Sequence, residues 1–263
     1  MAWGGWTESF SVFVGLYHHA PKRRLLFRVG AKPSAPAFGV FTAICIPELV
    51  VGIDICPHIW PDEAQTPPNL NLQVDDLNGR FTFPSNHFDL VHSQMMAGGI
   101  HSNRWRDYLR DIHRVLRPGG WVQTVEIYFN AQSDNGTLTQ NHALRRWSRR
   151  YLDSMQPYKD PRAPLQMQSW MQSAGFDSVE TQMIPLPTCG WSNGTESPNT
   201  GLWVVGADQR RKIHGNIRSA WRTERTMTSQ EFQVLVAQAR SEADNPEFRD
   251  NDPLLATGVL SNA

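Results

Sequence analysis

Short apolar runs alternate with amphipathic stretches along the chain, and this alternation predicts an α/β fold. Seven runs have the length and pattern of β-strands, namely residues 25–29, 49–53, 70–74, 88–91, 121–127, 179–184 and 254–260. Runs that are apolar throughout are typical of strands buried on both faces of a parallel sheet. We therefore expect a seven-stranded, mostly parallel sheet flanked by helices.

A helix is predicted over residues 105–116, where apolar residues from Trp105 to Leu116 recur at helical spacing. The charged residues between them, Asp107 and Asp111 included, are predicted to take the opposite face. A Pro-Gly-Gly turn at residues 118–120, which no helix could cross, leads into the strand at 121–127.

Three further helices follow from spacing and capping signals. One lies over residues 144–155, and a second begins near Pro164 and ends before Gly175. A third opens at Thr228 and Glu231, which have capping-box spacing. Residues 130–136 and 189–201 have loop composition, and no internal repeat occurs, so we expect one domain over residues 1–263.

Composition narrows the class of partner. Lys and Arg total 25, Asp and Glu total 25, and the formal net charge is zero, so no basic excess favours a nucleic-acid partner. Hydrophobic residues make up 40% of the chain and ten are tryptophans, which indicates a folded globular protein.

The three cysteines are scattered and form no Cys-x-x-Cys pair, so we expect neither a disulfide framework nor a metal site. Glu8 precedes the first apolar stretch, and no Lys or Arg does, which is the wrong order for a secretory signal. Polar residues and prolines interrupt the most apolar window, residues 35–55, so no membrane span is expected. We expect a cytoplasmic location, with the nucleus as the alternative.

Acidic residues close two neighbouring predicted strands. Asp54 follows the apolar strand 49–53, at the position where nucleoside-binding folds hold ribose hydroxyls. Asp54 could equally cap the turn before Pro57, so both interpretations stay open. Asp75 and Asp76 close the strand at 70–74.

These segments, taken in order, resemble a known family. Residues 51–55 (VGIDI), 74–76 (VDD), 83–92 (FPSNHFDLVH) and 115–121 (VLRPGGW) have the order and approximate spacing of class I S-adenosylmethionine-dependent methyltransferases. Within that superfamily they are similar to the fungal LaeA-like group associated with secondary metabolism. The resemblance covers residues 49–187 and leaves 1–48 and 188–263 poorly matched.

The resemblance implies a Rossmann-like fold, S-adenosylmethionine as cofactor and methyl transfer to a small molecule in secondary metabolite biosynthesis. It implies that Asp54 accepts hydrogen bonds from both ribose hydroxyls. Asp75 or Asp76, with Asp76 favoured, would accept the exocyclic amine proton of adenine. His92 and the residues up to Met96 would line the methionine end of the cofactor and the entrance for the acceptor.

The glycine-rich loop departs from the family pattern. Residues 28–34 read RVGAKPS, and only Gly30 matches the expected glycines. Arg28 replaces the acidic residue that would contact the cofactor's amino group, and Pro33 removes a backbone donor. Opposed charges ~4 Å apart interact by about 1 to 4 kcal/mol, so this exchange predicts weakened cofactor binding.

Methyl transfer needs an aligned acceptor rather than an enzymic nucleophile. A general base would help a hydroxyl acceptor, and His92, His101 and Glu126 are candidates, each with a structural role as the alternative.

Two other functions are compatible with parts of this pattern. A methyltransferase-like protein that has lost cofactor binding could serve as an accessory or regulatory protein partner in a biosynthetic pathway. A nicotinamide-dependent dehydrogenase is disfavoured, because that fold also needs the missing glycine-rich turn.

Overall fold

The computed structural model describes residues 25–28, 49–55, 57, 66, 68–133, 136–186, 227–243 and 254–263. They fall into two compact units, each built from segments that are separate in the sequence. Unit 2 spans residues 20–127, 157–183 and 257–263, and unit 1 spans 1–19, 128–156 and 184–256. The single-domain expectation stays a prediction.

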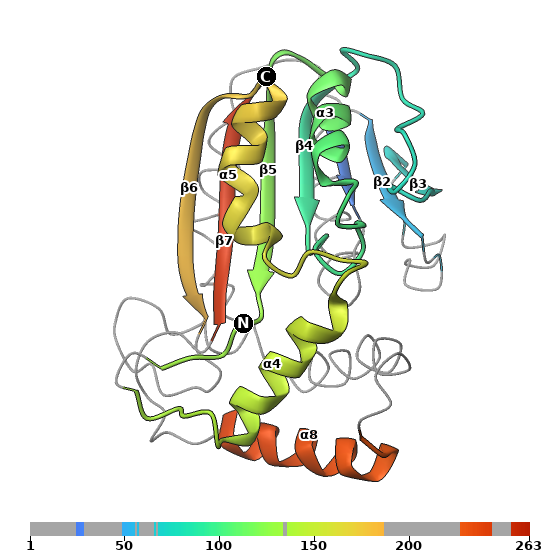
Figure 1. Cartoon of the computed structure of the whole chain (residues 1–263). Coiled ribbons are helices and arrows are strands. Elements are labelled where there is room, and N and C mark those ends of the chain that lie inside the picture. The colour runs from blue at the N-terminus through green and yellow to red at the C-terminus, as the bar shows by residue number, and fades with distance from the viewer. Residues whose placement is uncertain are drawn as a thin grey trace, which may run out of the picture. The chain divides into compact units, whose positions relative to one another are not determined.

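In the described part of the chain, strands form one sheet of seven in the order β3-β2-β1-β4-β5-β7-β6. Their bounds are Leu25–Arg28 (β1), Val50–Asp54 (β2), Leu70–Val74 (β3), Phe88–Gln94 (β4), Leu116–Tyr128 (β5), Asp177–Leu186 (β6) and Leu254–Asn262 (β7). Strands β1 to β5 pair in parallel, whereas β7 runs antiparallel to its neighbours (Figure 1). The sheet is therefore mixed, and the predicted α/β architecture is confirmed in its Rossmann-like outline.

The Pro-Gly-Gly segment lies inside β5 rather than before it. The β4–β5 register shifts between Phe88 and Leu90, opposite this segment. Gly119 has φ +75°, and a Cβ on Gly120 would come within 2.9 Å of the Arg117 carbonyl oxygen. Gly119 N–H also donates to the Ala263 carbonyl at 2.7 Å, and Ala263 N–H to that of Gly120 at 2.9 Å. Glycine is required here because the backbone conformation and the close approach both exclude a side chain.

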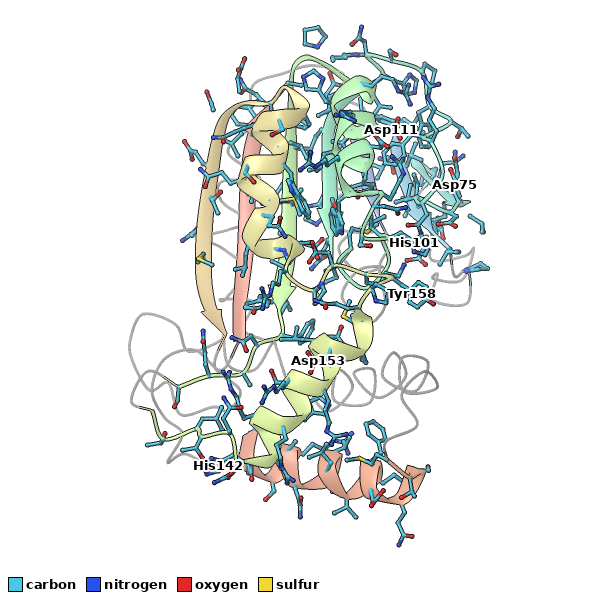
Figure 2. All side chains as sticks on the ribbon, in the orientation of Figure 1. Asp75, His101, Asp111, His142, Asp153 and Tyr158 are labelled. Atoms are coloured by element: carbon cyan, nitrogen blue, oxygen red, sulfur yellow. The ribbon has the colours of Figure 1, made fainter. Side chains whose placement is uncertain are left out.

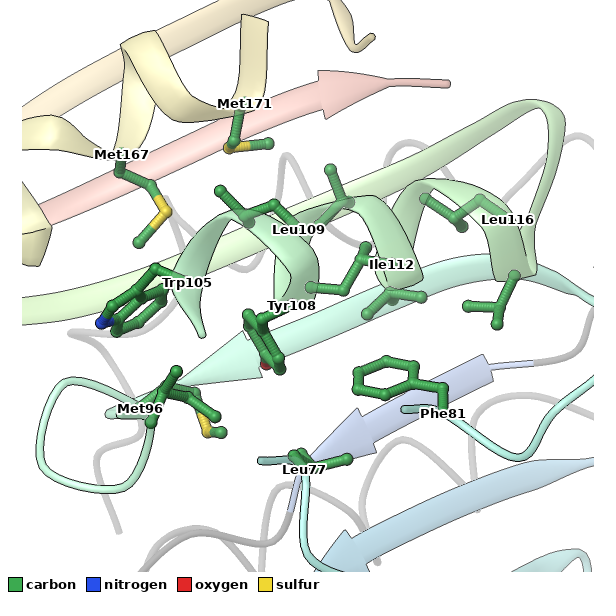
Figure 3. Close-up of a cluster of buried hydrophobic side chains, with 14 of the residues drawn as sticks. Leu77, Phe81, Met96, Trp105, Tyr108, Leu109, Ile112, Leu116, Met167 and Met171 are labelled. Carbon is green, nitrogen blue, oxygen red and sulfur yellow. The ribbon is translucent and has the colours of Figure 1, made fainter. Parts of the chain in front are cut away.

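Helices α3 (Trp105–Val115) and α5 (Ala163–Ala174) cover one face of this sheet (Figure 1). The apolar positions of α3 are fully buried, as the spacing predicted, and Trp105 is 1% exposed. Figure 3 shows Met167 and Met171 of α5 packed against α3. Phe81 lies on the same side of α3 as Tyr108, and the two rings are in contact. The main hydrophobic core of unit 2 therefore lies between these helices and the strands.

The prediction that Asp111 lies on the polar face of α3 is wrong, because its side chain is buried. Its side chain is only 10% exposed, and it forms ion pairs with Arg104 and Arg114. Its Oδ2 also accepts the Phe81 N–H at 3.3 Å, while Arg114 donates to the Phe81 and Phe83 carbonyls at 2.8 and 2.7 Å. Helical spacing alone puts Asp111 opposite the apolar residues. In the structure the segment before β4, which contains Phe81 and Phe83, covers that side of α3 and buries the Asp111 carboxylate.

Unit 1 contains α4 (Ala143–Met155) and α8 (Ser229–Ala243), which pack through a second apolar cluster that includes Trp147 and Phe232. The capping box is confirmed, because Glu231 accepts the Thr228 N–H at 2.7 Å and donates its own N–H to Thr228 Oγ1 at 3.2 Å. Helix α4 lacks a side-chain cap of its own. Glu242 of α8 accepts the Leu144 N–H at 2.7 Å instead, which satisfies a first-turn donor.

Asp111→Ala should destabilise the protein far more than Asp107→Ala, although both remove an acidic residue from α3. Loss of Asp111 leaves two partly buried arginines without their carboxylate, which costs about 3 to 5 kcal/mol. The ion pair of Asp107 with Arg110 is 62% exposed on both sides, so its loss costs at most about 1 kcal/mol. Urea unfolding monitored by tryptophan fluorescence measures both. Similar losses for the two variants would contradict the buried cluster.

Candidate functional site

The carboxyl ends of the parallel strands β1 to β4 share one edge of the sheet, and the predicted acidic residues lie there. Asp54 is the last residue of β2 and is 3% exposed. Its carbonyl accepts the N–H of Asp75, the first residue after β3, at 3.4 Å. Ligands of open α/β sheets bind at this edge, so Asp54 is a candidate binding group.

Asp76 organises the turn that follows β3. Its Oδ1 accepts both the backbone N–H of Asn78, at 3.0 Å, and the Asn78 side-chain amide, at 2.9 Å. These hydrogen bonds, with smaller contributions from His101 and Lys159, lower the pKa of the Asp76 carboxyl. Asp76 is therefore an exposed anion held in a fixed orientation.

A turn at residues 95–100 follows β4 and is tied to β5. Met95 N–H donates to the Val125 carbonyl at 2.9 Å. The next two N–H groups, of Met96 and Ala97, donate to Glu126 Oε1 and Oε2 at 2.7 and 2.9 Å. Glu126 is 1% exposed, so it is a buried structural acceptor in this structure.

The segment between α4 and α5 crosses the end of that turn. His101 and Lys159 pair as a single antiparallel β-bridge, and Ser102 N–H donates to the Tyr158 carbonyl at 2.9 Å. Figure 2 shows His101 and Tyr158 side by side. Lys159 Nζ donates to the Gly99 carbonyl, and burial lowers the pKa of this ammonium, although Asp76 partly opposes the effect. This places the Lys159 ammonium beside the Asp76 turn.

His92 lies within β4 rather than after it. It is 5% exposed, and its Nδ1 is 2.9 Å from Gln123 Oε1. Burial lowers the pKa of His92 to about 4. The imidazole is therefore neutral at pH 7 and is a weak base there.

The structure brings several of the predicted site residues to one edge of the sheet, while others lie elsewhere. Asp54, Asp75 and Asp76 follow adjacent strands, and His101 lies close to Asp76 through Asn78, whose Oδ1 accepts the His101 N–H at 2.8 Å. Gly30, together with the rest of the predicted glycine-rich loop after Arg28, lies outside the described residues.

Sequence reasoning missed two members of this cluster. Asn78 could have been found, since Asp-x-Asn is typical of a turn in which the aspartate accepts the later N–H. Lys159 carried no local signal, because a distant segment brings it there. Within the described ranges, no group of three metal-ligating side chains could hold an ion, and no helix has the length and apolar character to cross a bilayer.

Comparison with known proteins shows which proteins this chain is similar to. A family profile described as "Methyltransferase domain" matches residues 34–124, so β1 lies before the match. The secondary metabolism regulator LAE1 of Cochliobolus heterostrophus is 29% identical over 157 residues, which are 59% of this chain and 50% of that protein. Methyltransferase pytC of Aspergillus terreus is 29% identical over 174 residues, covering 65% and 51%. The resemblance to LaeA-like class I methyltransferases is confirmed.

A solved structure resembles this chain in its fold. Phosphoethanolamine N-methyltransferase 2 of Haemonchus contortus, solved with phosphomonomethylethanolamine and S-adenosylhomocysteine, matches with a TM-score of 0.56. The match covers 98% of this chain and 53% of that one, at 16% identity. At this identity the likeness shows the fold alone. The chain spans about half the length of the two curated relatives described here.

Acid should destabilise the protein partly through His92. Its folded pKa lies below the ordinary value of 6.5, so only the unfolded chain takes up this proton as the pH falls from about 6.5 to 4. The stabilisation is complete above pH 6.5 and is lost below it, by about 2 to 3 kcal/mol. His92→Gln should remove this part of the pH dependence, as measured by urea unfolding at pH 7 and pH 4.5.

The wild-type protein, measured at the same two pH values, supplies the reference slope. An unchanged slope in His92→Gln would show that the His92 imidazole titrates normally in the folded protein.

Proposed function

We propose that this protein is an S-adenosylmethionine-dependent methyltransferase that acts on a small molecule in fungal secondary metabolism. The observation that carries the proposal is the buried Asp54 carboxylate at the carboxyl end of β2, beside Asp75 and Asp76 at the end of the neighbouring strand β3. Ligands of open α/β sheets bind outside the carboxyl ends of such strands. The methyltransferase-domain match and the name of pytC favour methyl transfer.

The residues at this edge fit the adenosine part of the cofactor. Two carboxylate oxygens of Asp54 suit two ribose hydroxyl donors, since one carboxylate can accept several hydrogen bonds. Asp76 uses Oδ1 in both hydrogen bonds to Asn78, and its Oδ2 is the oxygen we assign to the exocyclic amine of adenine. When bound, S-adenosylmethionine supplies an electrophilic methyl group on a sulfonium.

The protein's own contribution is orientation rather than nucleophilic attack. Of the three residues considered as a general base, His101 is the one we retain, because it is exposed at this edge. His92 is too weak a base at neutral pH, and both Glu126 oxygens accept backbone N–H groups. We assign His101 the role of proton acceptor when the methyl acceptor is a hydroxyl.

The second candidate function is an accessory protein that has lost cofactor binding and acts through a protein partner. Two observations favour it: LAE1 is named as a regulator of secondary metabolism, and the sequence after β1 keeps only one glycine of the expected loop. The two functions differ in cofactor binding, which titration calorimetry measures directly.

The wild-type protein should bind S-adenosylmethionine and S-adenosylhomocysteine, and Asp54→Asn should weaken both. Losing one charge-assisted hydrogen bond costs about 1.5 to 3 kcal/mol, or roughly tenfold to a hundredfold in affinity. Asp89→Asn is the matched control, because Asp89 lies near the start of β4 and pairs with Arg117 at 3.0 Å. It removes an equal charge at the opposite end of the strands.

No binding by the wild type would select the accessory function. Equal weakening in both variants would show that net charge, rather than the Asp54 site, determines the affinity.

Two substitutions of Asp76 distinguish a role in binding adenine from a role in forming the turn after β3. Asp76→Asn keeps an oxygen that can accept the Asn78 N–H but removes the charge, whereas Asp76→Ala removes both. If Asp76 contacts adenine, both variants should lose about tenfold in affinity for S-adenosylhomocysteine, the effect of one charge-assisted hydrogen bond. If Asp76 only forms the turn, Asp76→Asn should bind like the wild type in calorimetry.

A further inference from the structure

Three consecutive backbone N–H groups after β4 are held by two consecutive residues of β5. Met95 donates to the Val125 carbonyl, and Met96 and Ala97 each donate to one oxygen of Glu126, at 2.7 and 2.9 Å. Only a carboxylate presents two acceptor oxygens at this spacing without carrying a donor. Glu126 therefore fixes where the chain goes when it leaves β4.

The same turn contains a strained residue at its first position. Met95 has φ +56° without being glycine, a conformation that costs energy and persists only where surrounding contacts enforce it. Its side chain is 37% exposed at the carboxyl end of β4. Such strain gathers at ligand sites, where it serves to orient groups in advance.

The far end of the turn is tied to the candidate adenosine site. The Gly99 carbonyl accepts from the Asn78 side-chain amide at 3.2 Å and from Lys159 Nζ, and Asn78 is held by Asp76. The turn at 95–100 thus spans from Glu126 on β5 to the Asp76 turn after β3.

We propose that Glu126 is a positioning residue, which holds the turn at 95–100 in the conformation that binds the cofactor beside Asp54 and Asp76. The inference rests on the proposed function, since it concerns the same edge of the sheet. Glu126 acts through the backbone of Met96 and Ala97 and does not itself touch the ligand.

The test compares Glu126→Gln with Thr124→Val. Gln has one acceptor oxygen, so its amide nitrogen would face one of the two N–H groups. Thr124 lies on the same strand two positions earlier, is 1% exposed, and its hydroxyl has no hydrogen-bond partner among the described residues. Thr124→Val is therefore a matched buried substitution that leaves the turn intact.

Three readouts are combined at a temperature where both variants are folded. The NMR amide proton signals of Met96 and Ala97 report their hydrogen bonds to Glu126. Hydrogen exchange reports the stability of the turn, and S-adenosylhomocysteine titration reports binding. In Glu126→Gln we expect one of these amide signals to move upfield, faster hydrogen exchange over residues 95–100, and affinity lower by about tenfold, the effect of one hydrogen bond to a charged group. Thr124→Val should match the wild type in all three.

Each result has a distinct meaning. Unchanged amide signals and exchange in Glu126→Gln would show that Glu126 does not hold the turn, which overturns the proposal. Altered signals and exchange with wild-type affinity would show that the turn has only a structural role, which also overturns the proposal. A wild-type protein that binds no S-adenosylhomocysteine would overturn the proposed function as well, and this result is recognised without any variant.

Discussion

Parallel pairing of β1 through β4 is the constraint on which the rest of the candidate site depends. Parallel strands in register end at the same edge, as β2 and β3 do where Asp54 lies opposite Val74. Acidic residues placed immediately after two such strands must therefore come together, whatever the loops between them do. The same pairing brings the end of β1 beside that of β2, with Arg28 opposite Ile53.

Several charged side chains among the described residues hold the backbone of neighbouring segments rather than face solvent. Asp111 and Arg114 hold the segment before β4, Glu126 holds the turn after it, and Glu242 caps α4. Each satisfies backbone donors or acceptors that would otherwise be buried without partners, at a cost of about 1 to 3 kcal/mol apiece. The loops on both sides of β4 are thus ordered by side chains of neighbouring elements.

That arrangement relates structure to the proposed chemistry. Methyl transfer gains from a fixed geometry between two ligands more than from reactive side chains. A turn anchored to β5 at one end and to the Asp76 turn at the other provides such geometry through hydrogen bonds between its backbone and the side chains of Glu126, Asn78 and Lys159. The sequence after β1 departs from the family's glycine-rich pattern, so under the proposed function the adenosine end supplies more of the cofactor affinity.

Local patterns in the sequence were enough to predict most elements and the Asp54, Asp75 and Asp76 edge. Apolar runs and helical spacing report burial of each element by itself, and the capping box at Thr228 and Glu231 is a contact between residues close in sequence. Only the tertiary structure decides that the Asp111 carboxylate is buried, that the Lys159 ammonium lies beside the Asp76 turn, and that Glu126 holds the turn at 95–100. Each depends on a partner far away in the chain, and the periodicity of a single segment carries no information about which distant backbone will cover it.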